Sequence, residues 1–253
     1  RRCGGCAHAC ARARGGRERL ARRRPDEEGR TEVPADSGEQ HDGHEHGRAD
    51  GPRARHAHSI ALQSAAVAPL VCASLNLLAA LVMAFVIAPA TPLVPEIAER
   101  ERYIREHLLP WRLAWLTWMA AGASLLWFYS WWRARVRGPK VALAIAAVGL
   151  VADWSAEIAL IASGADGYRS VAPAAFFLTG AIANGLYTFA GIQLTLATPL
   201  GVRARAYAAF MWSAALMLSL GAAIAQPLVV AIATAELFAL FCPWCVWLWL
   251  RLR

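Results

Sequence analysis

The chain has 253 residues, of which 57% are hydrophobic and only 17% are charged, and its formal net charge is +8. This composition is too apolar for an ordinary soluble domain. The excess positive charge does not indicate nucleic-acid binding, because the arginines of residues 1–58 have no aromatic side chains among them on which bases could stack.

Residues 1–58 form an Arg- and His-rich tail that we expect to be disordered. Its only large aliphatic side chains are Leu20 and Val33, and it has no Trp, Phe or Tyr, so it buries too little apolar surface to offset the entropy lost on ordering. The sequence begins at Arg1 and has its first Met at Met83. Either a leader is missing, or the start lies upstream of the true one. In the second case the tail is translated high-GC DNA and not part of the native protein.

Residues 59–253 are predicted to fold as an all-α, polytopic membrane helix bundle with six transmembrane helices. Each of six apolar segments is long enough to cross a bilayer as a helix, which takes about 20 residues. Trp residues crowd both ends of the second segment in the pattern of an aromatic belt. The segments cover residues 60–87, 111–132, 141–164, 171–198, 206–225 and 228–250.

A short helix on the membrane surface is predicted for residues 96–109, between the first two segments. Glu96 and Glu101 stand four residues before Arg100 and Arg105, which is the favourable order for ion pairs within one helix. Pro110 is expected to end this helix.

The loops predict the orientation of the chain. Basic residues are concentrated in alternate loops and at the C-terminus, whereas the intervening loops carry mixed charge or almost none. The positive-inside rule therefore places both termini in the cytoplasm, and we expect a multi-pass protein of the bacterial inner membrane. The basic residues are Arg133, Arg135, Arg137, Lys140, Arg203, Arg205, Arg251 and Arg253.

Asp153, Glu157, Asn184 and Glu236 are the candidate site residues within the apolar segments. Asp153 and Glu157 share one helix face, since residues four apart point the same way. At about 1.5 Å per residue, the three acids fall roughly 10 to 16 Å below the outer end of their helices, and Asn184 falls near 20 Å. Ionisable residues inside a membrane indicate a functional site. With no Lys or Arg at that depth, a proton or a small cation would complete the site.

Two functions remain open for these residues. One is proton- or cation-linked transport, in which the side chains converge on one polar cavity. The other is a non-catalytic packing or partner-binding subunit, in which hydrogen-bonded acids only fix the helices against one another. We do not expect the chain to be an enzyme, and we expect no cofactor. The apolar segments contain no His, the only Lys is Lys140, and no phosphate-binding glycine loop is visible.

The motif Cys-Pro-Trp-Cys at 242–245 allows a third function. It resembles the redox pair of thioredoxin-like proteins and of quinone-coupled membrane thiol oxidoreductases, which implies a redox role for Cys242 and Cys245. In those proteins the pair opens a helix, where the helix dipole favours the thiolate, whereas here it falls toward the end of one. The alternative is a proline kink flanked by two small apolar side chains.

The tail also carries residue types that bind metals. The spacing within residues 3–10 suits zinc, and a His-rich run follows from residue 41. The run and the six segments resemble the cation diffusion facilitators, but the His/Asp metal quartet of that family has no match in this sequence. The candidate ligands are Cys3, Cys6, His8, Cys10, His41, His44 and His46.

Three local patterns resemble a family of uncharacterised bacterial six-span membrane proteins. They are Pro-Trp-Arg-Leu-Ala-Trp at 110–115, Ala-Asp-Trp-Ser-Ala-Glu at 152–157 and Ala-Asn-Gly-Leu-Tyr at 183–187. The resemblance covers residues from about 69 to 250. It implies the fold and topology described above and brings no activity with it.

Overall fold

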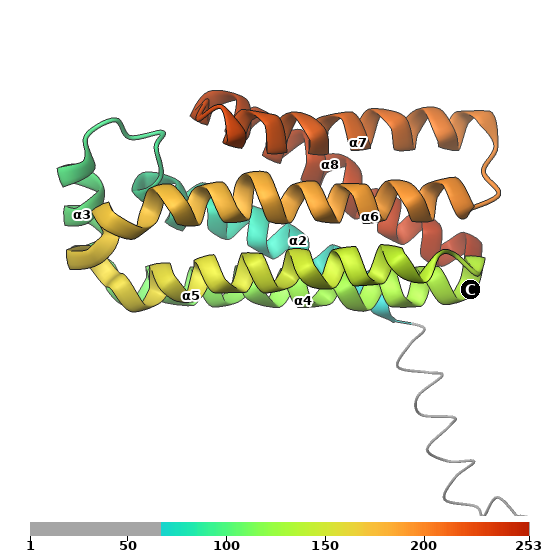
Figure 1. Ribbon diagram of the computed structural model, residues 1–253, viewed down its shortest axis with the longest axis horizontal. Coiled ribbons are helices and arrows are strands. Elements are labelled where there is room, and N and C mark those ends of the chain that lie inside the picture. Colours follow the sequence, from blue (N-terminus) through green and yellow to red (C-terminus); the bar gives the residue numbers. More distant parts are fainter. Residues whose placement is uncertain (1–66, 253) are drawn as a thin grey trace, which may run out of the picture. The chain divides into compact units, whose positions relative to one another are not determined.

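The computed structural model describes residues 67–252, which belong to one compact unit, Ala49–Arg253. Within this range the chain is helical with short connections and contains no strand (Figure 1), so the all-α prediction is confirmed there. The predicted tail, with its candidate metal ligands, lies outside the described residues.

The helices follow one another closely along the chain. A π-helical stretch, η1, and a short 3-10 helix, η2, extend the first described helix, and a second π-helical stretch, η3, joins α5 to α6. The elements are α2 (Ala68–Val82), η1 (Met83–Ile87), η2 (Ala88–Ala90), α3 (Ile97–Glu106), α4 (Leu108–Val136), α5 (Lys140–Phe177), η3 (Leu178–Ala183), α6 (Asn184–Ala197), α7 (Val202–Ala223) and α8 (Pro227–Leu252).

Four helical stretches are long and apolar enough to cross a membrane, which makes the fold compatible with a helical membrane bundle. They are Ala68–Ala90, Lys140–Ala197, Val202–Ala223 and Pro227–Leu252. The second stretch contains two of the predicted segments, 141–164 and 171–198. They are divided by a break in α5 at Gly164, whose φ of 56° and ψ of −151° are not helical. A positive φ costs glycine little. The chain reverses beyond this break, and α6 returns beside α5 (Figure 1).

The second predicted segment forms a helix, α4, that is not among these four stretches. Four of the six tryptophans of the expected belt, Trp111, Trp115, Trp131 and Trp132, are buried, because α4 packs against α2 and α5 and turns these rings into the bundle. Trp118 is partly buried, and Trp127 is 39% exposed. Pro110 lies in the first turn of α4 and does not end the preceding helix as expected. A proline is tolerated at that position because the first N–H groups of a helix have no partner within it.

The basic loops lie together at one end of the bundle (Figure 1). Arg135 at the end of α4 donates a hydrogen bond to the carbonyl of Leu252 at the end of α8. Trp132 Nε1 donates to Thr198 Oγ1, at the end of α6, over 2.9 Å. These residues therefore share one end, as the topology prediction requires. The compartment that this end faces remains a prediction.

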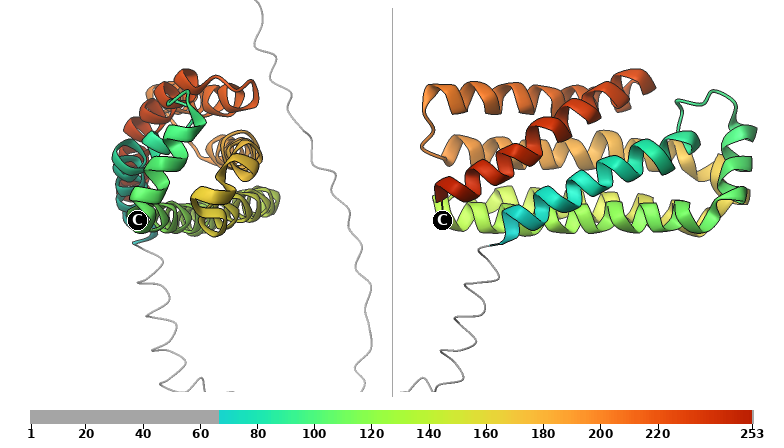
Figure 2. Two further views of the ribbon diagram at one scale, coloured as in Figure 1. Left: turned by 90° about the vertical axis from the view of Figure 1, so that its left-hand side faces the viewer. Right: turned by 180° about the vertical axis from the view of Figure 1, so that it is seen from behind.

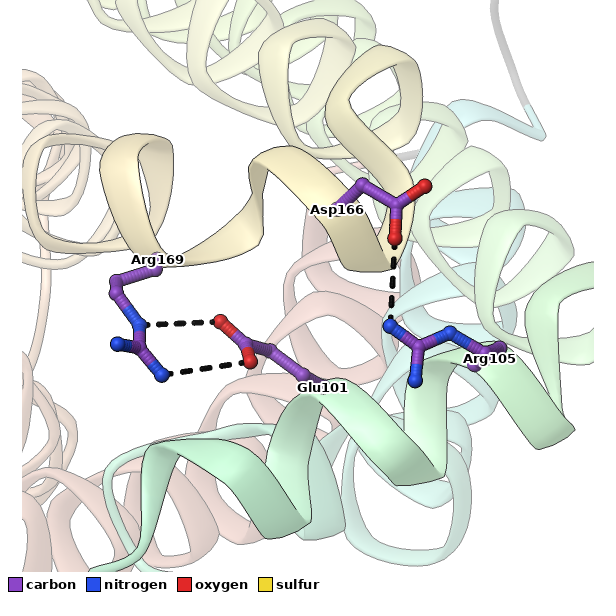
Figure 3. A network of polar contacts seen from close by, with 4 residues as sticks. All are labelled: Glu101, Arg105, Asp166 and Arg169. Atoms are coloured by element: carbon purple, nitrogen blue, oxygen red, sulfur yellow. Dashed lines mark hydrogen bonds and ion pairs between the residues drawn. The ribbon is translucent and has the colours of Figure 1, made fainter.

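The opposite end is closed by α3. Arg105 forms an ion pair with Asp166 at 3.3 Å, and Arg169 forms one with Glu101 at 3.2 Å (Figure 3). The predicted ion pair between Glu101 and Arg105 within α3 is therefore wrong. The reason is the break at Gly164, which brings the following turns of α5 alongside α3 and offers each side chain a partner from another helix.

Candidate functional site

Asp153 and Glu157 lie side by side in the interior of the bundle. Their side chains project from one face of α5 and are 3% and 0% exposed. The opposite face of the same helix carries Val151 and Ile158, which are 68% and 53% exposed. This division is expected for a helix that turns apolar side chains to lipid and acids to its neighbours.

Tyr187 on α6 holds the Asp153 carboxyl in place. Its hydroxyl donates a hydrogen bond to Asp153 Oδ2 over 3.2 Å. The Tyr187 backbone is held in turn by Tyr129 on α4, whose hydroxyl donates to the Tyr187 carbonyl over 3.0 Å. Side chains from three helices thus fix the position of one carboxyl oxygen.

Two glycines make room for this contact. A Cβ atom on Gly122 of α4 would lie 3.5 Å from both Asp153 Oδ2 and the Tyr187 hydroxyl oxygen. A Cβ atom on Gly149 of α5 would lie 3.1 Å from Cε1 of the Tyr187 ring, which is closer than ordinary contact. The backbones of α4 and α5 therefore form the wall against which the tyrosine and the carboxyl pack.

The π-helical stretch η3 contributes a third polar group. Thr179 lies within it, and its hydroxyl is buried near the Asp153 carboxyl. The Asn184 side chain donates from Nδ2 to the Thr179 carbonyl over 2.8 Å. A π-helical stretch displaces the regular backbone hydrogen bonds and often occurs at functional sites. In η3, the hydrogen bond from Asn184 engages the Thr179 carbonyl and so orients the segment that carries Thr179.

Several oxygen atoms of this cluster are buried without a hydrogen-bond partner. They are Asp153 Oδ1, Glu157 Oε1, Glu157 Oε2 and Thr179 Oγ1. Leaving a buried polar atom unpaired is costly, and two adjacent carboxylates in an apolar interior repel each other. The pair therefore favours a shared proton or a bound monovalent cation. No group of three or more His, Cys, Asp or Glu within residues 67–252 is arranged to hold a metal ion.

Tyr187 also lines a small pocket. Its volume is about 60 Å³, which exceeds the roughly 30 Å³ that a water molecule occupies in the liquid. Its polar lining comes from Asn76, Tyr129, Asn184, Tyr187 and Thr188. Tyr187 thus touches both the Asp153 carboxyl and a pocket of polar side chains.

The four residues singled out from the sequence do not form one cluster. Asp153 and Glu157 are adjacent, and Asn184 joins them only through the backbone of Thr179. Glu236 is partly buried on α8, and within the described residues the structure gives it no hydrogen bond or ion pair with either acid. Tyr187 and Thr179 were not singled out. Neither residue has a distinguishing signal in the sequence, because only the fold brings it to Asp153.

Cys242 and Cys245 lie within α8, which continues past Pro243 to Leu252. A third cysteine, not expected from the sequence, joins them. Cys72 on α2 belongs to the same buried core as Cys245. All three thiols are free.

The chain matches no protein-family model, no curated protein and no solved structure.

Proposed function

We propose that this chain is a multi-pass protein of the bacterial inner membrane that binds and transfers a proton or a small cation at Asp153 and Glu157. The observation that supports this proposal is the buried, adjacent position of two carboxyls whose oxygens are mostly unpartnered. An acid inside a membrane is expensive and generally serves an ion or proton path. We assign no catalytic reaction to the chain.

The charge distribution supports a role in cation or proton binding. Within the described residues, no Lys or Arg forms an ion pair with Asp153 or Glu157. A buried carboxylate without a neighbouring cation is neutralised either by a proton or by an ion that arrives from outside. The site can therefore change its occupancy without breaking an internal ion pair.

The surrounding groups form a hydrogen bond with Asp153 but not with Glu157. Tyr187 donates to Asp153 Oδ2, so this oxygen is already engaged. Asp153 Oδ1 and the two Glu157 oxygens are left to receive a proton or to bind a cation. The pocket that Tyr187, Asn76 and Asn184 line offers polar surface along which a proton or ion could approach the tyrosine.

The topology of the proposal follows the positive-inside rule. Six helices cross the membrane, the basic end faces the cytoplasm, and both termini lie on that side. α4 is the least apolar of the six, and it is held between α2 and α5.

A flux assay tests the proposal. The full chain is reconstituted into liposomes that contain a pH-sensitive dye, and proton movement is followed under an imposed potential with Na⁺, K⁺, Li⁺ or no added cation. The unchanged chain should move protons faster than empty liposomes. Asp153→Asn and Glu157→Gln should each reduce the flux to that of empty liposomes, because each removes an ionisable group while keeping hydrogen-bonding capacity.

The matched control is Glu106→Gln, the same chemical change on an exposed residue of α3. It should leave the flux unchanged. Glu236→Gln should also retain flux, which would separate the two-carboxyl site from the four-residue site expected from the sequence. If Asp153→Asn and Glu157→Gln fold and conduct like the unchanged chain, or if that chain conducts no better than empty liposomes, the acids are packing elements of a non-catalytic subunit.

A further inference from the structure

A groove of about 430 Å³ lies between the N-terminal turns of α7 and the C-terminal half of α8. This size falls within the range of small-molecule sites, about 300 to 1,000 Å³. The groove is far along the bundle from the carboxyl pair, at the end that carries the basic loops. It is lined by Arg203, Ala204, Tyr207, Pro243, Trp244 and Trp247.

The groove exists because α7 and α8 diverge toward the basic end (Figure 2). At their connected end they touch closely, since a Cβ atom on Gly221 would lie 2.9 Å from Cγ1 of Val229. Farther along, Ala204 offers only a methyl group on the α7 side. Pro243 is exposed on the α8 side, where it lacks a backbone N–H and interrupts the helical hydrogen bonds.

An aromatic stack forms the floor of the groove. The Tyr207 and Trp244 rings stack with their centroids 5.9 Å apart and an angle of 15° between their planes. Trp244 stacks in turn on Trp247 at 4.9 Å and 22°. The Tyr207 hydroxyl donates to the Leu240 carbonyl over 2.7 Å. The floor is therefore a fixed, flat and apolar surface that spans two helices.

The rim of the groove is positively charged. Arg203 lines it directly, and the Arg251 guanidinium lies over the Trp247 ring, 5.5 Å from its centroid. The Arg133–Lys140 turn adds charge at the same end of the bundle, where the described residues include no acid. An apolar aromatic floor beneath a cationic rim matches a molecule with an anionic head and a hydrocarbon tail.

We propose that this groove binds an anionic phospholipid. The phosphate pairs with Arg203, and one acyl chain lies along Tyr207, Trp244 and Trp247. The inference rests on the membrane location proposed above, but it does not depend on the carboxyl pair. A zwitterionic lipid would offer the same acyl chain, but its choline group would place a second positive charge at a rim that is already cationic.

Mass spectrometry of the intact protein tests the proposal. The full chain is purified in detergent and titrated with phosphatidylglycerol or phosphatidylcholine of the same acyl composition, and bound lipids are counted. The unchanged chain should retain phosphatidylglycerol in preference. Arg203→Gln should lower that affinity about fivefold, given about 1 kcal/mol for one basic residue at a lipid headgroup. Trp247→Leu should weaken retention of both lipids.

Arg205→Gln is the matched control, because it removes an exposed arginine two residues away that does not line the groove. It should bind phosphatidylglycerol like the unchanged chain. Equal retention of the two lipids, or equal losses in the Arg203 and Arg205 variants, would overturn the proposal. So would displacement of phosphatidylglycerol by an equal concentration of inorganic phosphate, since the site would then recognise the phosphate alone.

The two proposals fail separately. Lipid retention is measured in detergent, where no ion gradient is needed. Arg203→Gln should still conduct protons in liposomes if the carboxyl pair is functional. Loss of lipid preference with normal flux would contradict only the groove, and loss of flux in Asp153→Asn with normal lipid preference would leave the groove intact.

Discussion

The Tyr187 hydroxyl on α6 donates a hydrogen bond to Asp153 Oδ2 on α5, across 34 residues of sequence and over 3.2 Å. This bond joins the two arms that meet at the break at Gly164. It also assigns different tasks to the two carboxyls, since the Glu157 oxygens have no such donor.

Tyr187→Phe should separate the structural part of this bond from its functional part. Removing the hydroxyl should lower the free energy of unfolding by about 0.5 to 1.5 kcal/mol, measured by denaturant titration in mixed micelles. It should also change proton flux, because Asp153 Oδ2 loses its donor. Tyr103→Phe is the control. It removes another single bond, from the Tyr103 hydroxyl to the Val86 carbonyl at 3.0 Å, and should cost similar stability without changing flux.

Gly149→Ala should displace the Tyr187 ring. The added methyl would lie 3.1 Å from Cε1 and 3.2 Å from Cδ1 of that ring, and overpacking of this kind costs about 1 to 3 kcal/mol. Gly185→Ala provides the comparison, because its Cβ would meet only Ser219, at 3.8 Å or more. Alanine is the better helix former by about 0.5 to 1 kcal/mol, so Gly185→Ala should be neutral or stabilising. Equal losses in the two variants would contradict the proposed packing.

The orientation of the bundle can be tested by labelling. In a chain whose six cysteines have been replaced, Arg137→Cys should react with a membrane-impermeant maleimide only after intact cells are opened. A cysteine at Asp166, on the exposed end beside α3, should react in intact cells. Labelling of the Arg137→Cys variant from outside would reverse the topology, because it would put the basic end in the periplasm.

The sequence predicts the helices well because each carries its own signal. The apolar run that ends at Gly164 marks a boundary that the structure has at the same residue. The shared face of Asp153 and Glu157 also follows from their spacing of four, and the structure buries both. These features depend on local geometry, which the order of residues determines.

The partners of the site could not be predicted in the same way. Depth along a helix follows from residue number, but the direction in which a helix faces depends on its neighbours. Glu236 has the right depth, yet it belongs to α8, which packs mainly against α2 and α7. Tyr187 was overlooked because a tyrosine in an apolar segment has no special signal, and only the fold brings it to Asp153. The facing direction of the α4 tryptophans could not be predicted either, because their spacing fits a lipid-facing belt as well as a buried cluster.

The Tyr187–Asp153 bond also has a consequence for how the chain is made. In the membrane topology proposed above, α5 emerges from the ribosome before α6, so its two acids would reach the bilayer before Tyr187 and Thr179 are synthesised. Inserting an acid such as Asp near the middle of a lone helix costs about 2.5 to 3.5 kcal/mol. The part of α5 before the break at Gly164 is connected to α6 only by the turns that follow the break and by η3. The two arms are therefore suited to leave the translocon together as a hairpin, with the acids already covered by α6 when they first meet lipid.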